Sequence, residues 1–260
     1  MGWRVIRRYG WSPLSCMLLF GVIFSSSHFL AAFPSRPSAA TQTLVAALER
    51  RYRASKTLEA KFLERYSENG QLLRSEAGIA YFRRPGKMRW EYESPEKNLF
   101  LVDGKTAWFY VPTDHTVTRA PAKESTDWRT PLALLAGEMK LSRVCARVDL
   151  AVGEIPDTPG DVVLDCHVRG ETSGHEKSSA SAPDMDGLQD TGAEQAVFLE
   201  VAPATADLAR VLVRQKGGVS VDFRFANWRF DPPLPDSFFR FDVPQGVAIV
   251  NGESPDPSDR

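Results

Sequence analysis

From residue 58 onward, short stretches of the chain alternate between apolar and polar residues. Leu58, Ala60 and Phe62 occupy one set of alternate positions, and Glu59 and Lys61 occupy the other. Alternate side chains of an extended strand point to opposite faces of a sheet. The pattern therefore predicts a strand with one buried and one exposed face.

Turn signals separate this strand from those that follow. Asn69-Gly70 is a strong hairpin signal. After it the alternation resumes at Leu73, Ala77, Ile79 and Tyr81. Further strands are predicted around Trp90, Leu99, Trp108, Val117, Cys145 and Cys166, and over residues 197–201, 209–215 and 219–230. Because turns connect consecutive strands, the sequence predicts a mainly antiparallel β protein.

Two segments have the pattern of helices. Residues 42–52 carry apolar side chains at helical spacing, at Leu44, Val45, Leu48 and Tyr52. In residues 130–137, TPLALLAG, Thr130 can cap a helix that has Pro131 in its first turn and ends at Gly137. The fold class is therefore α+β but mainly β, with one helix near the N-terminus and a short apolar helix in the middle of the chain.

The first 40 residues differ from the rest. They contain four arginines and no acidic residue, and a mostly apolar stretch over residues 14–32 ends in small residues. This order predicts a secretory signal peptide, cleaved after Ala32 or after Ala40. A membrane anchor is disfavoured because such an anchor needs about 20 apolar residues and this stretch contains several serines. We therefore expect an exported protein.

The remaining chain is predicted to form a single domain over residues 41–250, because strand patterns lie on both sides of each loop. Residues 170–195 are rich in Ser, Gly, Asp and Glu and offer little apolar surface to bury. They are predicted to be a polar surface insertion rather than a domain boundary. Residues 251–260 are predicted to be a flexible tail.

Composition and charge narrow the function classes. The chain has 260 residues, of which 43% are hydrophobic and 25% charged, as in globular proteins. Without residues 1–40, 32 − 4 = 28 basic residues face 33 acidic ones, a formal charge of about −5. Such a chain has no basic field to attract a polyanion, so nucleic acid is not an expected partner.

Two cysteines, Cys145 and Cys166, lie beyond the predicted signal peptide. Exported proteins meet an oxidising compartment, so a disulfide between them is a candidate. The residues around them predict two strands joined by the loop at residues 153–161, whose middle is close to the midpoint between the cysteines. Two buried free thiols remain the alternative, because the strand register is not fixed by the sequence.

No catalytic motif is present among those with a recognisable spacing: the chain lacks G-x-S-x-G, H-E-x-x-H, a P-loop, G-x-G-x-x-G and C-x-x-C. His115, His167 and His175 are far apart in the sequence, so neither a metal site nor a cofactor is expected. Asp103 and Asp114 fit turns without any chemical role. The sequence therefore does not predict an enzyme.

Five segments in a fixed order resemble the LolA family of periplasmic carriers of outer-membrane lipoproteins. They are LEAKFLERY, YFRRPGKMRWEY, LVDGKTAWFYVP, TPLALLAG and FDVPQGVAIV. The resemblance implies an incomplete, strongly curved antiparallel β-barrel of about eleven strands with a helical lid. It also implies an apolar cavity between sheet and lid that receives the acyl chains of a lipoprotein.

The same resemblance implies roles for individual residues. Arg84 matches the family arginine that holds the lid shut by donating hydrogen bonds to backbone groups of the lid helices. The candidate residues of the acyl-chain cavity are Phe62, Tyr81, Met88, Trp90, Phe100, Trp108, Leu132, Leu134 and Leu135. Alternation alone does not say which aromatic side chains face the cavity.

The implied function is that of a monomeric periplasmic chaperone for acylated lipoproteins. Its implied donor is an inner-membrane ABC transporter that releases lipoproteins (LolCDE-like), and its implied acceptor is an outer-membrane protein (LolB-like). A lipid- or lipoprotein-binding sensor of the same fold is the alternative. A periplasmic lipid hydrolase is a more remote one.

Overall fold

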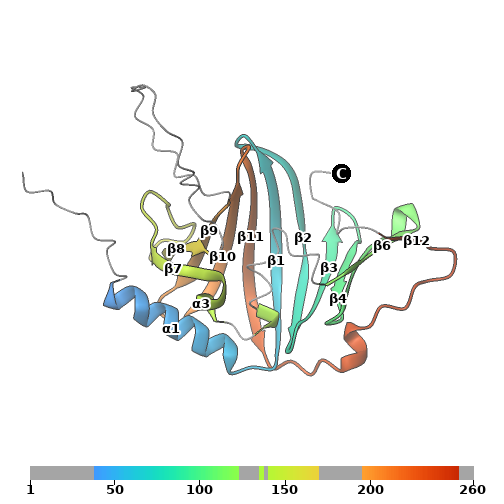
Figure 1. Ribbon diagram of the computed structural model, residues 1–260, viewed down its shortest axis with the longest axis horizontal. Helices are drawn as coiled ribbons and strands as arrows, with labels where there is room; N and C mark the ends of the chain where they lie inside the picture. Colours follow the sequence, from blue (N-terminus) through green and yellow to red (C-terminus); the bar gives the residue numbers. More distant parts are fainter. Residues whose placement is uncertain (1–37, 123–134, 138–139, 170–194, 252–260) are drawn as a thin grey trace, which may run out of the picture. The chain divides into compact units, whose positions relative to one another are not determined.

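One twelve-stranded sheet dominates the computed structural model (Figure 1). The structure describes residues 38–122, 135–137, 140–169 and 195–251. The order of strands in the sheet is β12-β6-β5-β4-β3-β2-β1-β11-β10-β9-β8-β7. Because β12 and β7 are the two ends of this order, the sheet is open rather than closed.

The strands are short at the edges and long in the centre. The first six are β1 (Thr57–Glu68), β2 (Gln71–Arg83), β3 (Lys87–Ser94), β4 (Leu99–Val102), β5 (Thr106–Val111) and β6 (Thr116–Pro121). The last six are β7 (Cys145–Leu150), β8 (Val162–Val168), β9 (Gln195–Ala202), β10 (Asp207–Gln215), β11 (Val219–Phe230) and β12 (Ala248–Asn251). The mainly β fold predicted from the alternation is confirmed.

The helix predicted over residues 42–52 is α1 (Ala39–Arg53). It begins at Ser38, whose hydroxyl oxygen accepts a hydrogen bond from the backbone N–H of Thr41 at 3.1 Å, as is usual for a serine N-cap. The other helical elements are α3 (Leu141–Val144), η1 (Pro112–Asp114) and η2 (Asp236–Phe239). None of the helices in the described ranges is both long enough and apolar enough to cross a membrane.

The sheet differs from the prediction at one edge. It has twelve strands instead of about eleven, and β12 pairs with β6 in parallel, whereas every other strand pair is antiparallel. A parallel neighbour needs a long connection. Residues 231–247 provide it by running from the end of β11, in the middle of the sheet, to β6 near the edge.

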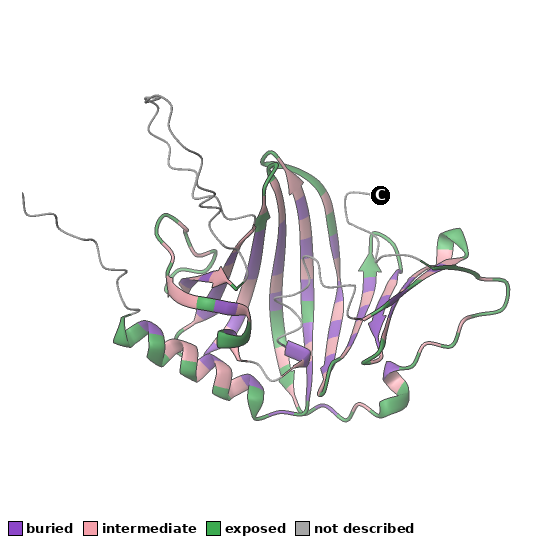
Figure 2. Ribbon diagram, in the orientation of Figure 1, coloured by how far each residue is buried: buried purple, intermediate pink, exposed green. Residues whose placement is uncertain are grey.

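Burial alternates along the central strands (Figure 2). In β1, Leu58, Ala60 and Phe62 are buried, whereas Lys61 is exposed. We call the face that carries the buried side chains the inner face. These side chains form one buried cluster with Leu48 and Tyr52 of α1, so α1 covers the inner face.

The opposite, outer face is crossed by residues 231–247, which we call the outer segment. The Phe238 ring lies 4.9 Å from the ring of Tyr81 on β2, measured between centroids. Further along, the Phe241 ring lies 5.5 Å from the ring of Trp108 on β5. Asp236 forms an ion pair with Arg83 at 2.9 Å. The outer segment therefore partly covers aromatic side chains that β2 and β5 would otherwise expose.

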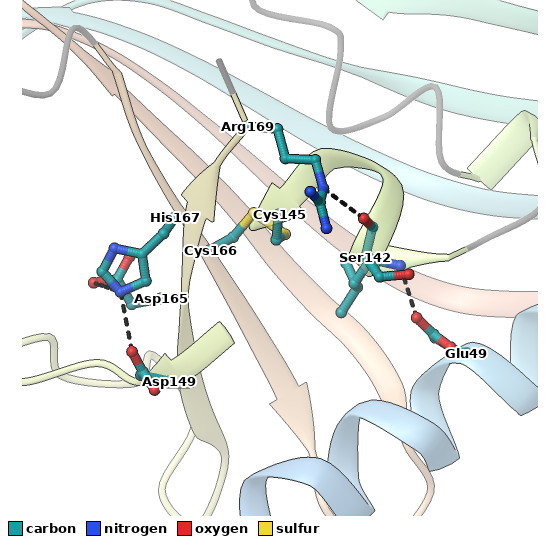
Figure 3. Close-up of a disulfide and its surroundings, with 9 residues drawn as sticks. Glu49, Ser142, Cys145, Asp149, Asp165, Cys166, His167 and Arg169 are labelled. Carbon is teal, nitrogen blue, oxygen red and sulfur yellow. Dashed lines mark hydrogen bonds and ion pairs between the residues drawn. A yellow bond between two sulfur atoms is a disulfide. The ribbon is translucent and has the colours of Figure 1, made fainter. Parts of the chain in front are cut away.

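A disulfide joins β7 and β8 at the other edge of the sheet (Figure 3). The Cα atoms of Cys145 and Cys166 lie 5.2 Å apart. The cysteines are not directly opposite in the register, because Cys145 pairs with Val168 and Cys166 with Val148. An irregularity after Cys145 shifts the register. The candidate disulfide is thus present, with its two cysteines offset in the register rather than directly opposite.

The disulfide edge is tied to α1 through α3. The backbone N–H of Leu141 donates to the Glu49 carboxylate at 2.7 Å. On the other side of α3, Arg169 donates to the Ser142 carbonyl at 2.7 Å (Figure 3). The helix over the inner face is therefore connected to the disulfide-linked hairpin.

The predicted signal peptide, insertion and tail lie outside the described residues, except for the N-cap residue 38, residues 39–40 in α1, residue 195 in β9 and residue 251 in β12. These three assignments therefore stay predictions.

Candidate functional site

Aromatic side chains form the centre of the inner face. Phe62 on β1 contacts Trp90 on β3, with ring centroids 4.8 Å apart in an edge-to-face arrangement. Trp90 also contacts Phe82 of β2 and Phe223 of β11, at 5.7 Å and 5.6 Å between ring centroids. Each such pair adds about 0.5–1.5 kcal/mol to the gain from burial. The inner face is therefore a continuous apolar surface across β11, β1, β2 and β3.

Five of the predicted cavity residues lie in this buried cluster: Phe62, Met88, Trp90, Phe100 and Leu135. They come from β1, β3, β4 and the helical turn at residues 135–136, which are distant in sequence. Leu132 and Leu134 lie outside the described residues. The structure thus brings together residues from three of the segments that carry the family resemblance.

Two residues assigned to the cavity, Tyr81 and Trp108, do not lie on the inner face. Tyr81 and Trp108 lie on the outer face, where their rings contact Phe238 and Phe241 of the outer segment. The physical reason is strand alternation: the neighbouring Phe82 and Phe109 take the inner positions. The apolar residues at positions 73, 77, 79 and 81 therefore mark the less buried face of β2.

Tyr52 fixes the C-terminal end of α1 against the sheet. Its side chain is fully buried, and its hydroxyl oxygen accepts a hydrogen bond from the backbone N–H of Leu208 at 2.8 Å. The Tyr52 ring lies edge-on to Trp228 at 5.0 Å between centroids. Burial raises the pKa of the Tyr52 hydroxyl far above its ordinary value, so this group stays neutral.

Arg84 follows β2 and links two separate backbone segments that lie over the inner face. Its Nε donates to the carbonyl of Gly137 at 2.5 Å. One of its terminal nitrogens donates to the carbonyl of Ser55, just after α1. Carbonyls at helix ends lack partners within the helix, and the guanidinium supplies rigidly oriented donors. Arg84 therefore connects the end of α1 to the turn at residues 135–137.

The surroundings of Arg84 reinforce this connection. The backbone N–H of Gly86 donates to the carbonyl of Ala136 at 2.9 Å, and the N–H of Arg84 donates to the carbonyl of Lys56 at 3.0 Å. Burial lowers the pKa of the Arg84 guanidinium, and the nearby Asp231 opposes that effect. Three hydrogen bonds to backbone carbonyls thus come from Arg84 itself.

The adjacent Arg83 has a different role. It points to the outer face, where it donates to the carbonyl of Leu234 and pairs with Asp236 at 2.9 Å between Nε and Oδ1. Two consecutive arginines therefore hold different parts of the chain: Arg84 the residues over the inner face, and Arg83 the outer segment.

Sequence reasoning missed a polar group on the inner face. Glu64 is 2% exposed and occupies the inner position next after Phe62 along β1. The Tyr92 hydroxyl donates to the Glu64 carboxylate at 2.8 Å. The signal was present, because Glu64 continues the series Leu58, Ala60, Phe62 at period two. A charged residue within an apolar series is easily taken for the end of a buried face.

The family comparison agrees with the motifs. Residues 53–151 match the model of the outer membrane lipoprotein carrier protein LolA. Arg84, the inner-face aromatic residues of β1 to β3, and the turn at residues 135–137 all fall within this match.

Individual relatives extend the similarity over most of the chain. The outer-membrane lipoprotein carrier protein of Dechloromonas aromatica is 25% identical over 197 residues, which cover 75% of this chain and 82% of that protein. The protein of the same name from Chromobacterium violaceum is 39% identical over 132 residues, covering 50% of this chain and 58% of that protein.

Among solved structures, the LolA superfamily protein NE2245 of Nitrosomonas europaea is similar with a TM-score of 0.41 and 11% sequence identity. The alignment covers 78% of this chain and 99% of that one. The family match and the two sequence relatives thus confirm the resemblance to the LolA family that was seen in the motifs.

Proposed function

We propose that this protein is a periplasmic carrier that takes up acylated lipoproteins, shields their acyl chains on the inner face of the sheet and delivers them to the outer membrane. The observation that carries the proposal is the match to the lipoprotein-carrier family over residues 53–151, which include the inner-face residues of β1 to β5. Relatives named outer-membrane lipoprotein carrier proteins support the periplasmic location. Their role as carriers also favours binding and transfer rather than catalysis.

The inner face suits acyl chains because it is broad and apolar. Each methylene group removed from water contributes about 0.8 kcal/mol, so several buried chains approach tens of kcal/mol. Binding at that strength alone would make release too slow. In this structure the inner-face side chains are instead buried against α1 and residues 135–136. Restoring these contacts after cargo leaves offsets part of the lost burial and helps release.

Arg84 is proposed to act as the latch of this closed arrangement. Its bonds to the carbonyls of Ser55 and Gly137 join the two segments that must separate before chains reach the inner face. Hydrogen bonds from a charged donor contribute about 1.5–3 kcal/mol each. Such a latch favours the closed form when no cargo is bound. Its contribution is smaller than the gain from burying several acyl chains, so cargo can open it.

Partners on both sides of the periplasm follow from this proposal. Acylated cargo must be extracted from the inner membrane by an energy-consuming donor, proposed to be an ABC transporter of the LolCDE type. Delivery needs either an acceptor of the LolB type or the outer membrane itself. The protein is proposed to work as a monomer, because one chain supplies both the inner face and the segments that cover it.

Release of lipoproteins from spheroplasts tests the function. The purified protein, without its predicted signal peptide, is added to energised spheroplasts, and soluble acylated proteins are identified by mass spectrometry. We expect one-to-one complexes with acylated lipoproteins. A cargo variant without the acylated cysteine is the control and should yield none. Lack of any release, while an established carrier works alongside, would contradict the carrier function and favour the sensor.

A further inference from the structure

The short connection between α1 and β1, residues 54–56, lies between two charged side chains. On one side Arg84, at the end of β2, donates to the carbonyl of Ser55. On the other side Asp231, which follows β11, accepts a hydrogen bond from the backbone N–H of Lys56 at 2.8 Å. In the proposed carrier, α1 must leave the inner face before acyl chains reach it, and this connection joins α1 to the sheet. The two charges therefore hold the point about which α1 turns.

Both charges bind the same peptide group. The carbonyl of Ser55 and the N–H of Lys56 belong to one peptide unit, in which the oxygen and the hydrogen point in opposite directions. A cation at the oxygen and an anion at the hydrogen are both aligned favourably with the peptide dipole. Each hydrogen bond therefore polarises the group and strengthens the other bond. Rotation of this peptide group out of its position breaks both bonds.

The next peptide group is held by the same two residues. The carbonyl of Lys56 accepts a hydrogen bond from the backbone N–H of Arg84 at 3.0 Å. The N–H of Thr57, in the same peptide unit, hydrogen-bonds to the Asp231 carboxylate. The pKa of the Asp231 carboxyl lies below its ordinary value chiefly because of the hydrogen bond from Lys56, and the charge of Arg84 lowers it further. Two consecutive peptide groups thus bridge Arg84 and Asp231.

Asp231 is fixed in place by contacts with the beginning of β1. Its backbone N–H donates to the carbonyl of Thr57 at 3.0 Å, and the Thr57 hydroxyl donates to the carbonyl of the next residue, Pro232, at 2.7 Å. The φ angle of Asp231 is 53°, in the left-handed region that Asp and Asn adopt more readily than most other residues. The Asp231 backbone is therefore anchored to the sheet, so its carboxylate can orient the connection to α1.

We propose that Asp231 is a positioning residue of the latch, which holds the peptide group between Ser55 and Lys56 so that its carbonyl faces Arg84. This inference rests on the proposed carrier function and makes the closing of the carrier more specific. Asp231 binds the opposite side of this peptide group from Arg84, so it affects cargo release through Arg84. A role in joining β11 to β1 alone would be independent of Arg84, and this difference can be measured.

Two substitutions separate the carboxylate of Asp231 from its backbone conformation. Glycine and asparagine both tolerate the left-handed φ, so neither strains the chain. Asp231→Gly removes the acceptor, whereas Asp231→Asn keeps an acceptor oxygen without the charge. The measurement is transfer of a labelled lipoprotein from the loaded carrier to outer-membrane vesicles. We expect Asp231→Gly to slow transfer about threefold to tenfold, as for the loss of one exposed hydrogen bond, and Asp231→Asn to restore part of the rate.

The double variant Arg84→Leu/Asp231→Gly distinguishes positioning from general stabilisation. If Asp231 acts through Arg84, adding Asp231→Gly to Arg84→Leu should change the transfer rate by less than about twofold. Asp207→Asn is the matched control, because Asp207 ties α1 to β10 through an ion pair with Arg51 at 2.6 Å. Its effect should be the same with and without Arg84. Equal slowing by Asp231→Gly in both backgrounds would overturn the positioning role and leave the carrier function intact.

A readout without cargo separates failure of this inference from failure of the carrier function. In the NMR spectrum of the empty protein, the amide proton of Lys56 reports its hydrogen bond to Asp231. We expect Arg84→Leu to move this resonance upfield, toward its position in Asp231→Gly, and Arg83→Leu to move it much less. An unchanged Lys56 resonance in Arg84→Leu would overturn the positioning role. If the resonance moves as expected but the wild-type protein transfers no lipoprotein, the carrier function fails and the positioning of the Ser55 carbonyl stands.

Discussion

Replacing Arg84 with leucine is expected to leave cargo uptake intact and to block its delivery. The variant loses the bonds to the carbonyls of Ser55 and Gly137. With these two bonds at about 1.5–3 kcal/mol each, the equilibrium between closed and open forms should shift more than 100-fold toward open. Without these hydrogen bonds, closing no longer releases the free energy that helps to displace the cargo. The bound acyl chains therefore stay on the inner face.

The measurement is transfer of a labelled lipoprotein from the loaded carrier to outer-membrane vesicles. We expect the complex with Arg84→Leu to form normally and its transfer rate to fall at least tenfold. Arg83→Leu is the matched control, because Arg83 carries the same charge but contacts the outer segment. Equal transfer rates for Arg84→Leu and the wild-type protein would contradict the latch. A comparable fall in the transfer rate of Arg83→Leu would indicate that the loss of transfer comes from general destabilisation of the fold.

The second large effect is expected from removal of the disulfide. The cysteines are separated by 21 positions in sequence. Closing a loop of that length restricts the unfolded chain and stabilises the fold by about 3 kcal/mol. In a chain of this size that corresponds to a fall in Tm of roughly 6–12 °C. The loss should affect α1 as well, because Glu49 of α1 accepts a hydrogen bond from Leu141 of α3, the helix that leads directly into Cys145.

Scanning calorimetry of the oxidised protein and of the variant Cys145→Ala/Cys166→Ala measures this effect. The oxidised protein should melt at the higher temperature, and adding reductant should lower the wild-type Tm toward that of the variant. Reductant should not change the variant, which controls for unrelated effects of the reagent. Melting of both proteins within about 1 °C of each other would show that the crosslink contributes little.

The sequence was sufficient to predict where the strands lie but not which side chains of each strand point to the inner face. Period two divides the side chains of β2 into two sets, and both sets contain apolar residues, ending with Tyr81 on one and Phe82 on the other. The inner set, with Phe82, belongs to the buried cluster that includes Leu48 and Tyr52 of α1. The outer set is covered by Phe238, from a segment 150 or more residues away. Contacts so distant in the sequence leave no trace in a local pattern.

Arg84 illustrates a different limit. The residues around it gave no reason to prefer a buried position over a surface one, and only the family resemblance indicated its importance. Its partners are backbone carbonyls, which every residue possesses, so no complementary side chain marks them in the sequence. The burial of Glu64 was not predicted for a different reason: charged residues are usually exposed.

Crosslinking from the two faces of the sheet tests the central claim most directly. A photoreactive amino acid replaces Trp90 on the inner face in one variant and Trp108 on the outer face in another. Each variant is loaded with a lipoprotein whose acyl chains are radiolabelled, irradiated and digested. We predict labelled acyl chains attached at position 90 and none at position 108. Equal labelling at both positions, or labelling at 108 alone, would contradict binding of acyl chains to the inner face.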